Sequence, residues 1–196
     1  VGSEMCIRDS HWLLEQGYPA EKIVVAGDSA GGGLALALCL WLKNHKEPLP
    51  SGVIAMSPWT DLTISGESVE TNFEKDPLFG KTRDSMLYNK DYLGDNDPTN
   101  EYISPLFGDY EGFPPLLIQV GSYEMLLSDS TRVAKKAKEA GGKVKLSIYE
   151  GMFHVFQMAM LLMPESKKAW AEIKRFLHYL DTEENEMQNI SKEEKA

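Results

Sequence analysis

The chain has 196 residues, of which 42% are apolar and 26% are charged, a composition that fits one globular domain and excludes two full-sized ones. Lysine and arginine number 20 against 30 acidic residues, and this net charge of −10 makes the average surface repel a phosphate backbone, so no nucleic acid partner is expected. The longest apolar stretch, residues 34–42, is far shorter than the roughly 20 residues that span a bilayer, so no membrane anchor is expected.

The two ends of the chain differ from its middle. Residues 1–10 lack the apolar region of a signal peptide and resemble a translated sequencing adaptor, so we expect a non-native leader before a domain over 11–180. Residues 181–196 carry six acidic and two basic groups, which predicts a disordered acidic tail. The cysteines, Cys6 and Cys39, are too few for a disulfide framework and favour a reducing, cytoplasmic location.

The first predicted elements form a strand, a helix and a strand. A short helix is predicted over 10–16, where glycine follows as a stop signal. The β-branched and apolar run 23–26 predicts a strand buried on both faces of a parallel sheet. Residues 30–44 are apolar on nearly every side, which predicts an enclosed helix, and 53–57 form the next buried strand.

A long excursion follows, in which most of the prolines lie between residues 58 and 115. One helix is predicted inside it, over 83–92, and excursions of this kind often shape a pocket. A third buried strand is predicted over 116–120, where glycine ends the apolar run.

The remaining elements are two helices and one strand. Ser128 or Asp129 is predicted to cap a helix that continues through Ala140, and 144–149 alternates like a fourth strand. Pro164 suits the first position of the last helix. The order of elements predicts the α/β class, with a doubly wound, mostly parallel sheet and covering helices. An apolar stripe is predicted on the last helix at Trp170, Ile173, Phe176, Leu177 and Leu180.

Residues 27–31 read GDSAG, a G-x-S-x-G pattern that follows a predicted strand and opens a predicted helix. A sharp turn between these elements brings neighbouring backbone close, so we expect Gly27 and Gly31 to be needed beside Asp28 and Ser29. The Ser29 hydroxyl is then held above the strand ends as a nucleophile. The N–H of Ala30, at the start of the helix, is the expected oxyanion donor.

A serine hydroxyl needs a base within hydrogen-bond reach. His154 lies in the loop after the predicted strand 144–149, at the same carboxyl edge of the sheet as Ser29, and is the expected base. The other histidines lie on or near predicted helices, where surface roles are the ordinary expectation: His11, His45 and His178.

The acid that orients the base is expected to follow the third strand. Glu124 and Asp129 both qualify, and we favour Glu124 because it is nearer the strand end, whereas Asp129 has a structural explanation in the first turn of a helix. The order serine, acid, histidine is typical of α/β-hydrolases.

With these residues in place, the chain resembles the bacterial hormone-sensitive-lipase family of α/β-hydrolase esterases. The resemblance rests on VVAGDSAGGGLALAL around Ser29, SPWTDL, VGSYEMLLSDS around Glu124 and EGMFHVF around His154. It implies hydrolysis of small short-chain carboxylic esters or lactones through an acyl-serine intermediate, without metal or cofactor. The family's usual acid at the Glu124 position is aspartate.

The chain also departs from the family, which places a His-Gly-Gly-Gly motif upstream of the nucleophile to complete the oxyanion hole. No such motif occurs here, and only 28 residues precede Ser29. We therefore expect the carboxyl-terminal part of a longer enzyme, with about four strands of the family sheet. The strand over 23–26, interior in that family, is then expected to present unpaired N–H and C=O groups on an apolar edge. Each missing oxyanion donor is expected to lower the rate by about 10²- to 10³-fold.

Roles outside the catalytic residues are expected for aromatic residues and for one further acid. Trp59, Phe73 and Phe79, with Phe107, could line an acyl pocket or serve local packing. Asp61 is expected to organise a turn. A serine peptidase or amidase on the same fold and a non-catalytic ligand-binding relative are the alternative functions, and a homodimer is left open.

Overall fold

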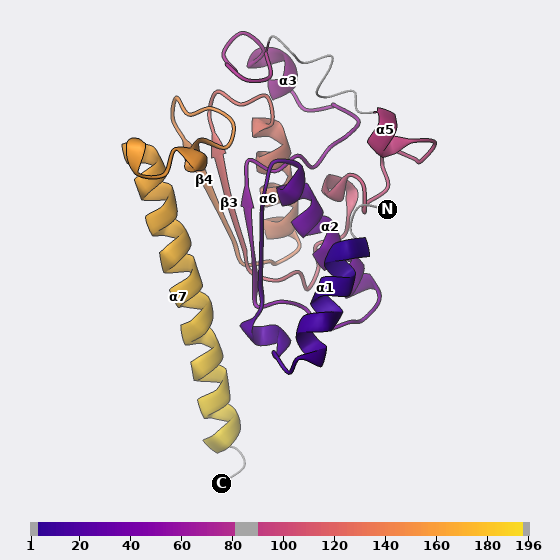
Figure 1. Cartoon of the computed structure of the whole chain (residues 1–196), viewed down its shortest axis with the longest axis vertical. Helices are drawn as coiled ribbons and strands as arrows, with labels where there is room; N and C mark the ends of the chain where they lie inside the picture. Colours follow the sequence, from indigo (N-terminus) through magenta and orange to yellow (C-terminus); the bar gives the residue numbers. More distant parts are fainter. Residues whose placement is uncertain (1–3, 81–89, 194–196) are drawn as a thin grey trace.

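The computed structural model describes residues 4–80 and 90–193, with one four-stranded sheet and helices on both of its faces (Figure 1). The strands are β1 (Val24–Asp28), β2 (Gly52–Met56), β3 (Leu116–Gly121) and β4 (Val144–Tyr149). The longer helices are α1 (Glu4–Glu15), α2 (Ala30–Asn44), α6 (Leu127–Glu139) and α7 (Pro164–Glu193). The short segments are η1 (Ala20–Lys22), α3 (Ser68–Thr71), α5 (Lys90–Leu93), η2 (Pro105–Phe107) and η3 (Phe156–Leu162).

The four strands lie in chain order, β1-β2-β3-β4, and every neighbouring pair is parallel. Helices α2 and α6 cover one face of the sheet and α7 the other (Figure 1). This arrangement confirms the predicted α/β class. Since all strands run the same way, the loops that follow them meet at one edge of the sheet.

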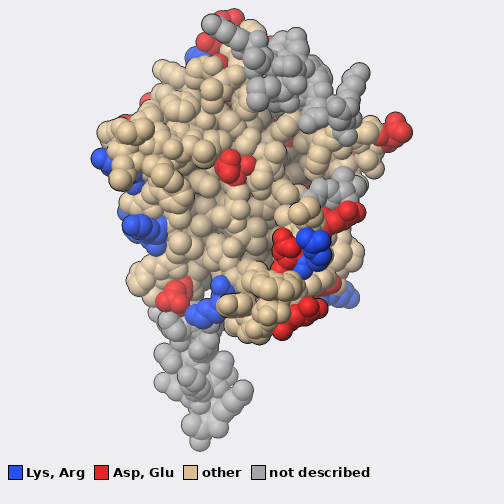
Figure 2. All heavy atoms as spheres, in the orientation of Figure 1, with Lys and Arg blue, Asp and Glu red and all other residues tan. Residues whose placement is uncertain are grey.

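Charged side chains on the face shown in Figure 2 lie mainly near its margins, with acidic and basic groups interspersed among the described residues. No helix in the described ranges is both long enough and apolar enough to cross a bilayer.

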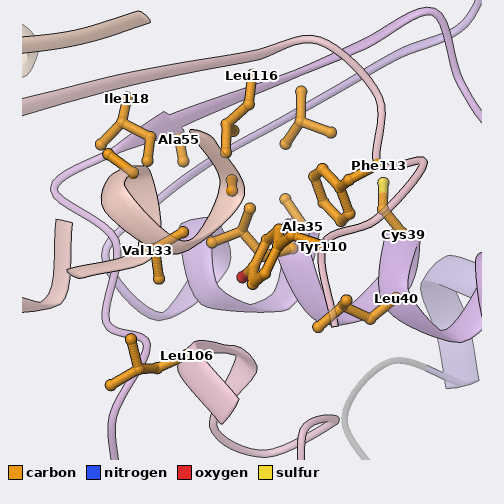
Figure 3. Close-up of a cluster of buried hydrophobic side chains, with 14 residues drawn as sticks. Ala35, Cys39, Leu40, Ala55, Leu106, Tyr110, Phe113, Leu116, Ile118 and Val133 are labelled. Atoms are coloured by element: carbon orange, nitrogen blue, oxygen red, sulfur yellow. The ribbon is translucent and has the colours of Figure 1, made fainter. Parts of the chain in front are cut away.

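The larger hydrophobic core lies between the sheet and the helices α2 and α6 (Figure 3). Alternate strand residues point into it, as the period-two geometry of strands requires, while the residues between them face α7. Tyr110, in the segment between β2 and β3, packs into this core, and its hydroxyl donates a hydrogen bond to the Pro105 carbonyl. The α7 side has a smaller core built on Ile54, Leu117 and Ile173.

The strand predicted over 23–26 is less buried than expected. β1 lies at an edge of the described sheet, its residues are half-buried or exposed, and Ala26 is exposed. The prediction of burial on both faces is therefore wrong, because an apolar run does not show how many neighbours a strand has. The expected position at an open edge of the sheet is confirmed.

The predicted cap of α6 is also wrong. The residue at the cap position is Leu126, without a side-chain hydrogen bond to the helix. Ser128 instead accepts a hydrogen bond from the Ser68 N–H, and Asp129 points toward the segment after β2. Both side chains make hydrogen bonds that hold the segment between β2 and β3 against α6. Capping rules consider only neighbours in sequence, so they do not predict such contacts.

The last helix begins at Pro164, as predicted, but its stripe and its end differ. Ile173 and Leu180 are buried, whereas Trp170 and Leu177 are 36% and 41% exposed. The helix continues to Glu193 through the segment predicted as a disordered tail, which is rich in the good helix formers Glu and Lys. Most of the helix predicted over 83–92 lies outside the described residues.

The excursion between β2 and β3 is fixed to α6 by a buried carboxylate. Asp61 accepts hydrogen bonds from Thr63 and Ser65 and forms an ion pair with Arg132 at 2.8 Å. Burial opposes ionisation, but the hydrogen bonds outweigh it and hold the pKa of Asp61 below its usual value. The prediction that Asp61 organises a turn is confirmed.

Candidate active site

The turn between β1 and α2 holds Ser29 in an unusual backbone conformation, with φ 53° and ψ −124°. A positive φ is uncommon for a residue with a Cβ and is often found at functional sites. The Ser29 N–H donates to the Met56 carbonyl, which ties the turn to β2. The turn is tight, since a Cβ on Gly27 would lie 2.2 Å from the Gly31 carbonyl oxygen.

The predicted need for glycine holds at Gly27 and not at Gly31. A Cβ on Gly31 would meet no atom within 4 Å, and Gly31 lines a cavity. The closer contact is at Gly33, where an added Cβ would lie 2.0 Å from the Trp59 carbonyl oxygen. Asp28, also in the motif, is exposed to solvent.

The structure brings together the three side chains that the sequence assigned to catalysis. Ser29 Oγ lies 2.8 Å from His154 Nε2, and His154 Nδ1 lies 2.9 Å from Glu124 Oε2. His154 is 8% exposed and Glu124 is fully buried. With Nδ1 donating to the carboxylate, Nε2 is free to accept the serine proton, so the geometry suits general-base activation of the hydroxyl.

The carboxylate of Glu124 is fixed by donors from three segments. Oε2 accepts from His154, while Oε1 accepts from the Ser57 hydroxyl at 2.7 Å and from the Gly121 N–H. These donors satisfy both oxygens of a carboxylate that water does not reach.

Asp129, the alternative acid, has other partners. Its Oδ2 accepts hydrogen bonds from the N–H groups of Thr60 and Asp61 and from the Thr60 hydroxyl. Burial raises the pKa of Asp129 to about 7; the Thr60 N–H opposes the rise and the nearby Asp61 adds to it. The structure therefore places Glu124, and not Asp129, against the histidine.

The loops that carry the acid and the base touch each other through their backbones. The Ser122 N–H donates to the Tyr149 carbonyl, and the Tyr123 N–H donates to the Met152 carbonyl. A Cβ on Gly121 would lie 2.1 Å from that same Met152 oxygen. A glycine at the end of β3 is thus what lets the two loops approach closely enough for Glu124 to reach His154.

Ala30 is the first residue of α2, so its N–H has no acceptor within the helix and lies at the positive end of the helix dipole. A cavity of about 280 Å³ begins beside it. Its walls come from α2 and the excursion: Ala30, Gly31, Gly33, Leu34, Ala37, Trp59, Leu62, Tyr92, Tyr102 and Ile103.

Of the aromatic residues considered for an acyl pocket, only Trp59 lines the cavity beside Ala30, and it also packs against the cluster that contains Phe79. Phe79 is buried with its ring 4.5 Å from the ring of His154, and Phe73 packs at the edge of the same small cluster. Phe79 therefore supports the imidazole from one side. Phe107, 37% exposed, lies in η2.

Sequence reasoning missed three polar residues around the acid. Ser57 binds Glu124 directly, Asn72 donates to the carbonyls of Ser122 and Glu124, and Asp76 accepts from the Met125 N–H. Ser57 could have been noticed, since it follows β2 at the same sheet edge as Ser29. No short-range signal marks Asn72 and Asp76, because their partners are about 50 residues away in sequence.

Residues 2–158 match the family model for the alpha/beta hydrolase fold, and the chain belongs to this family. It is 45% identical over 170 residues to an esterase of Acinetobacter venetianus, covering 86% of this chain and 56% of that protein. It is 40% identical over 157 residues to an acetyl-hydrolase of Streptomyces hygroscopicus, covering 80% and 52%.

Within the family, the resemblance to the bacterial hormone-sensitive-lipase branch is confirmed. A crystal structure of an esterase from that branch superposes with a TM-score of 0.83 at 41% identity, covering 87% of this chain and 57% of that one. The chain thus spans about half the length of the curated relatives it matches.

Proposed function

We propose that this chain carries the nucleophile, base and acid of a serine carboxylesterase that hydrolyses short-chain carboxylic esters through an acyl-serine intermediate. The observation that carries the proposal is the continuous pair of hydrogen bonds from Ser29 Oγ through the imidazole of His154 to Glu124 Oε2. A partly exposed hydroxyl, an almost buried imidazole and a buried carboxylate form a gradient from solvent to core that suits this chemistry.

Each residue has one role in the proposed reaction. His154 Nε2 takes the proton of Ser29 as the oxygen attacks the ester carbonyl carbon, and the Ala30 N–H donates to the resulting oxyanion. The imidazolium then gives its proton to the leaving alcohol oxygen, which leaves the acyl group on Ser29. A water molecule, deprotonated by His154, releases the acid and restores the serine. Glu124 holds the imidazole in one tautomer and stabilises its cationic form throughout.

Small substrates fit the surroundings of the serine. The cavity beside Ala30 has a volume of about 280 Å³, near the lower end of the usual range for ligand sites, and Trp59, Leu62 and Ile103 give it apolar walls. The names of the relatives, esterase and acetyl-hydrolase, agree with a short acyl group. We assign the acyl or alcohol part of the ester to this cavity.

Turnover by the 196 residues is expected to be slow. The chain contributes one oxyanion donor, Ala30, and contains no His-Gly-Gly-Gly motif to supply another. Loss of one donor lowers rates by about 10²- to 10³-fold. A covalent probe that needs a single attack by Ser29 is therefore a better first measurement than steady-state hydrolysis.

The test measures labelling of Ser29 by a fluorophosphonate, together with release of p-nitrophenol from its acetate and from longer esters. We expect labelling of one serine, located by mass spectrometry, and loss of both signals in Ser29→Ala. Ser51→Ala is the matched control, because Ser51 donates to the Ile23 carbonyl outside the site. Equal signals in wild type and Ser29→Ala would contradict the proposal.

The identity of the acid is tested with the same probe. Glu124→Gln keeps the shape of the side chain but removes the charge that orients His154, so we expect labelling to slow by about 10³- to 10⁴-fold. Asp129→Asn changes a carboxylate of equal burial that has no contact with the histidine in the structure, and its labelling rate should stay within a few fold of wild type. The reverse result would reassign the acid.

A further inference from the structure

Ser57 occupies a constrained position directly after β2. It is fully buried, its backbone has a φ of 48°, and its N–H donates to the Gln119 carbonyl of β3 at 2.7 Å. A positive φ at a buried non-glycine residue is unfavourable, so the surrounding structure must hold it in place. The hydroxyl is thereby aimed at the space between the acid loop and the base loop.

The hydrogen bonds of the Ser57 hydroxyl have a fixed direction. Its oxygen accepts the backbone N–H of Val155 at 3.1 Å, and its single proton goes to Glu124 Oε1 at 2.7 Å. An N–H can only donate and an ionised carboxylate can only accept, so the hydroxyl cannot exchange these two roles. One side chain therefore links the acid to the residue that follows the base.

Val155 needs such a link more than most residues do. It is β-branched and has a φ of 52°, a conformation that costs free energy for a branched side chain. His154 immediately precedes it, so relaxation of Val155 would rotate the peptide group that carries the imidazole. The Ser57 hydroxyl and the Phe79 ring contact this short segment from two directions.

We propose that Ser57 is a positioning residue for the hydrolysis proposed above: its one hydroxyl keeps the carboxylate of Glu124 and the backbone beside His154 at a fixed separation. The inference rests on the proposed function for its kinetic consequence. The expected change in the contact between His154 and Glu124 when the Ser57 hydroxyl is removed does not depend on turnover.

Two substitutions remove the hydroxyl in different backbone contexts. Ser57→Ala keeps the Cβ, and Ser57→Gly also relieves the positive φ, so a loss common to both belongs to the hydroxyl and not to folding strain. We expect fluorophosphonate labelling of Ser29 to slow by about 10-fold in each, as for the loss of one hydrogen bond to a charged group. Ser104→Ala is the matched control, because Ser104 is equally buried and accepts the Leu62 N–H.

A purely structural role would leave the contact between His154 and Glu124 unchanged, and a positioning role would not. The proton NMR signal of the His154 Nδ1–H, which faces Glu124, should therefore move in both Ser57 variants and stay in place in Ser104→Ala.

The outcomes separate the two proposals. An unchanged labelling rate together with an unchanged His154 signal in Ser57→Gly would overturn the role of Ser57. If wild type is not labelled at Ser29, the esterase proposal fails, and the NMR signal alone then decides whether Ser57 positions the pair. A 10-fold slower Ser104→Ala would also overturn the assignment, because any buried hydroxyl would then have the same effect.

Discussion

At the scale of single residues, the two carboxylates that follow β3 show how surroundings divide similar groups. Glu124 and Asp129 are both buried. Glu124 receives donors from the imidazole, a hydroxyl and the N–H of Gly121, all at the carboxyl edge of the sheet. Asp129 receives its donors from the excursion, where they hold Thr60 and Asp61 against α6. Glu124 therefore contacts the imidazole, whereas Asp129 joins two parts of the fold.

Asp129 leads to a prediction about stability and pH. Burial raises its folded pKa from 3.8 to about 7, so between these values the folded protein holds a proton that the unfolded chain has released. The free energy of unfolding should therefore fall as pH rises from about 4 to 7, by at most about 1.4 kcal/mol per pH unit for this group. Asp129→Asn, which stays neutral, should lose this dependence in urea unfolding measured across that range.

Asp97 provides the control with the opposite sign. Hydrogen bonds from Thr99 lower the pKa of this exposed carboxylate, so any contribution to stability is present above its ordinary value and is lost on acidification. Asp97→Asn should therefore leave the slope between pH 4 and 7 close to that of wild type. An unchanged slope in Asp129→Asn would show that its backbone donors, and not burial, control its ionisation.

At the scale of elements, the turn from β1 to α2 couples the nucleophile to the core. α2 is almost entirely buried beyond its first turn, so the position of its amino end is fixed by packing along the whole helix. The turn itself has no room for adjustment at Gly27. Ser29 and the Ala30 N–H are thus placed by the helix, and the loop has little freedom to move them.

Substitution of the two motif glycines tests this point. In Gly27→Ala the new methyl group would lie 2.2 Å from the Gly31 oxygen, so the turn must shift. We expect the free energy of unfolding to fall by about 2–3 kcal/mol and the labelling of Ser29 to be lost. In Gly31→Ala the methyl group enters open space in a helical turn, where alanine is favoured by about 0.5–1 kcal/mol. Thermal unfolding and probe labelling measure both effects. Equal destabilisation in both would contradict the steric account.

At the scale of the whole molecule, the open edge of β1 is the exposed consequence of the strand order. In the described chain β1 pairs with β2 alone, and its residues VVAGD carry no basic side chain at that edge. The other edge strand, β4, includes Lys145, and lysine in particular discourages pairing of an edge strand with further chains, whereas the charged residue of β1, Asp28, lies only at the end of the strand. The two edges of the sheet are therefore unequal as sites of association.

We expect concentration-dependent association through β1 to fall in Ala26→Lys. Ala26 is exposed, so the lysine is accommodated, and it changes the net charge only from −10 to −9. A decrease in association then comes from the edge and not from stronger overall repulsion. Light scattering over a concentration series measures it, with Ile148→Lys on β4, 49% exposed, as the charge-matched control. A larger effect of the control would place the contact at β4.

The local pattern of the sequence was sufficient to predict the strands and the turn that holds Ser29. Apolar runs marked the first three strands and an alternating pattern marked the fourth, all to within two residues. The motif at 27–31 marked the turn at Ser29, because each of these signals lies within a few residues of the chain. The sequence also placed His154 and Glu124 near Ser29, because parallel strands send their following loops to one edge.

The contacts between distant segments were decided only by the tertiary structure. Short-range rules made Asp129 a helix cap, whereas folding brings it to Thr60, and they assigned Ser57 only to a strand, whereas folding brings it to Glu124, 67 residues away. The burial of β1 depended in the same way on how many neighbours the strand has. Backbone preferences act between near neighbours in sequence, while burial and hydrogen-bond partners depend on which segments meet in space.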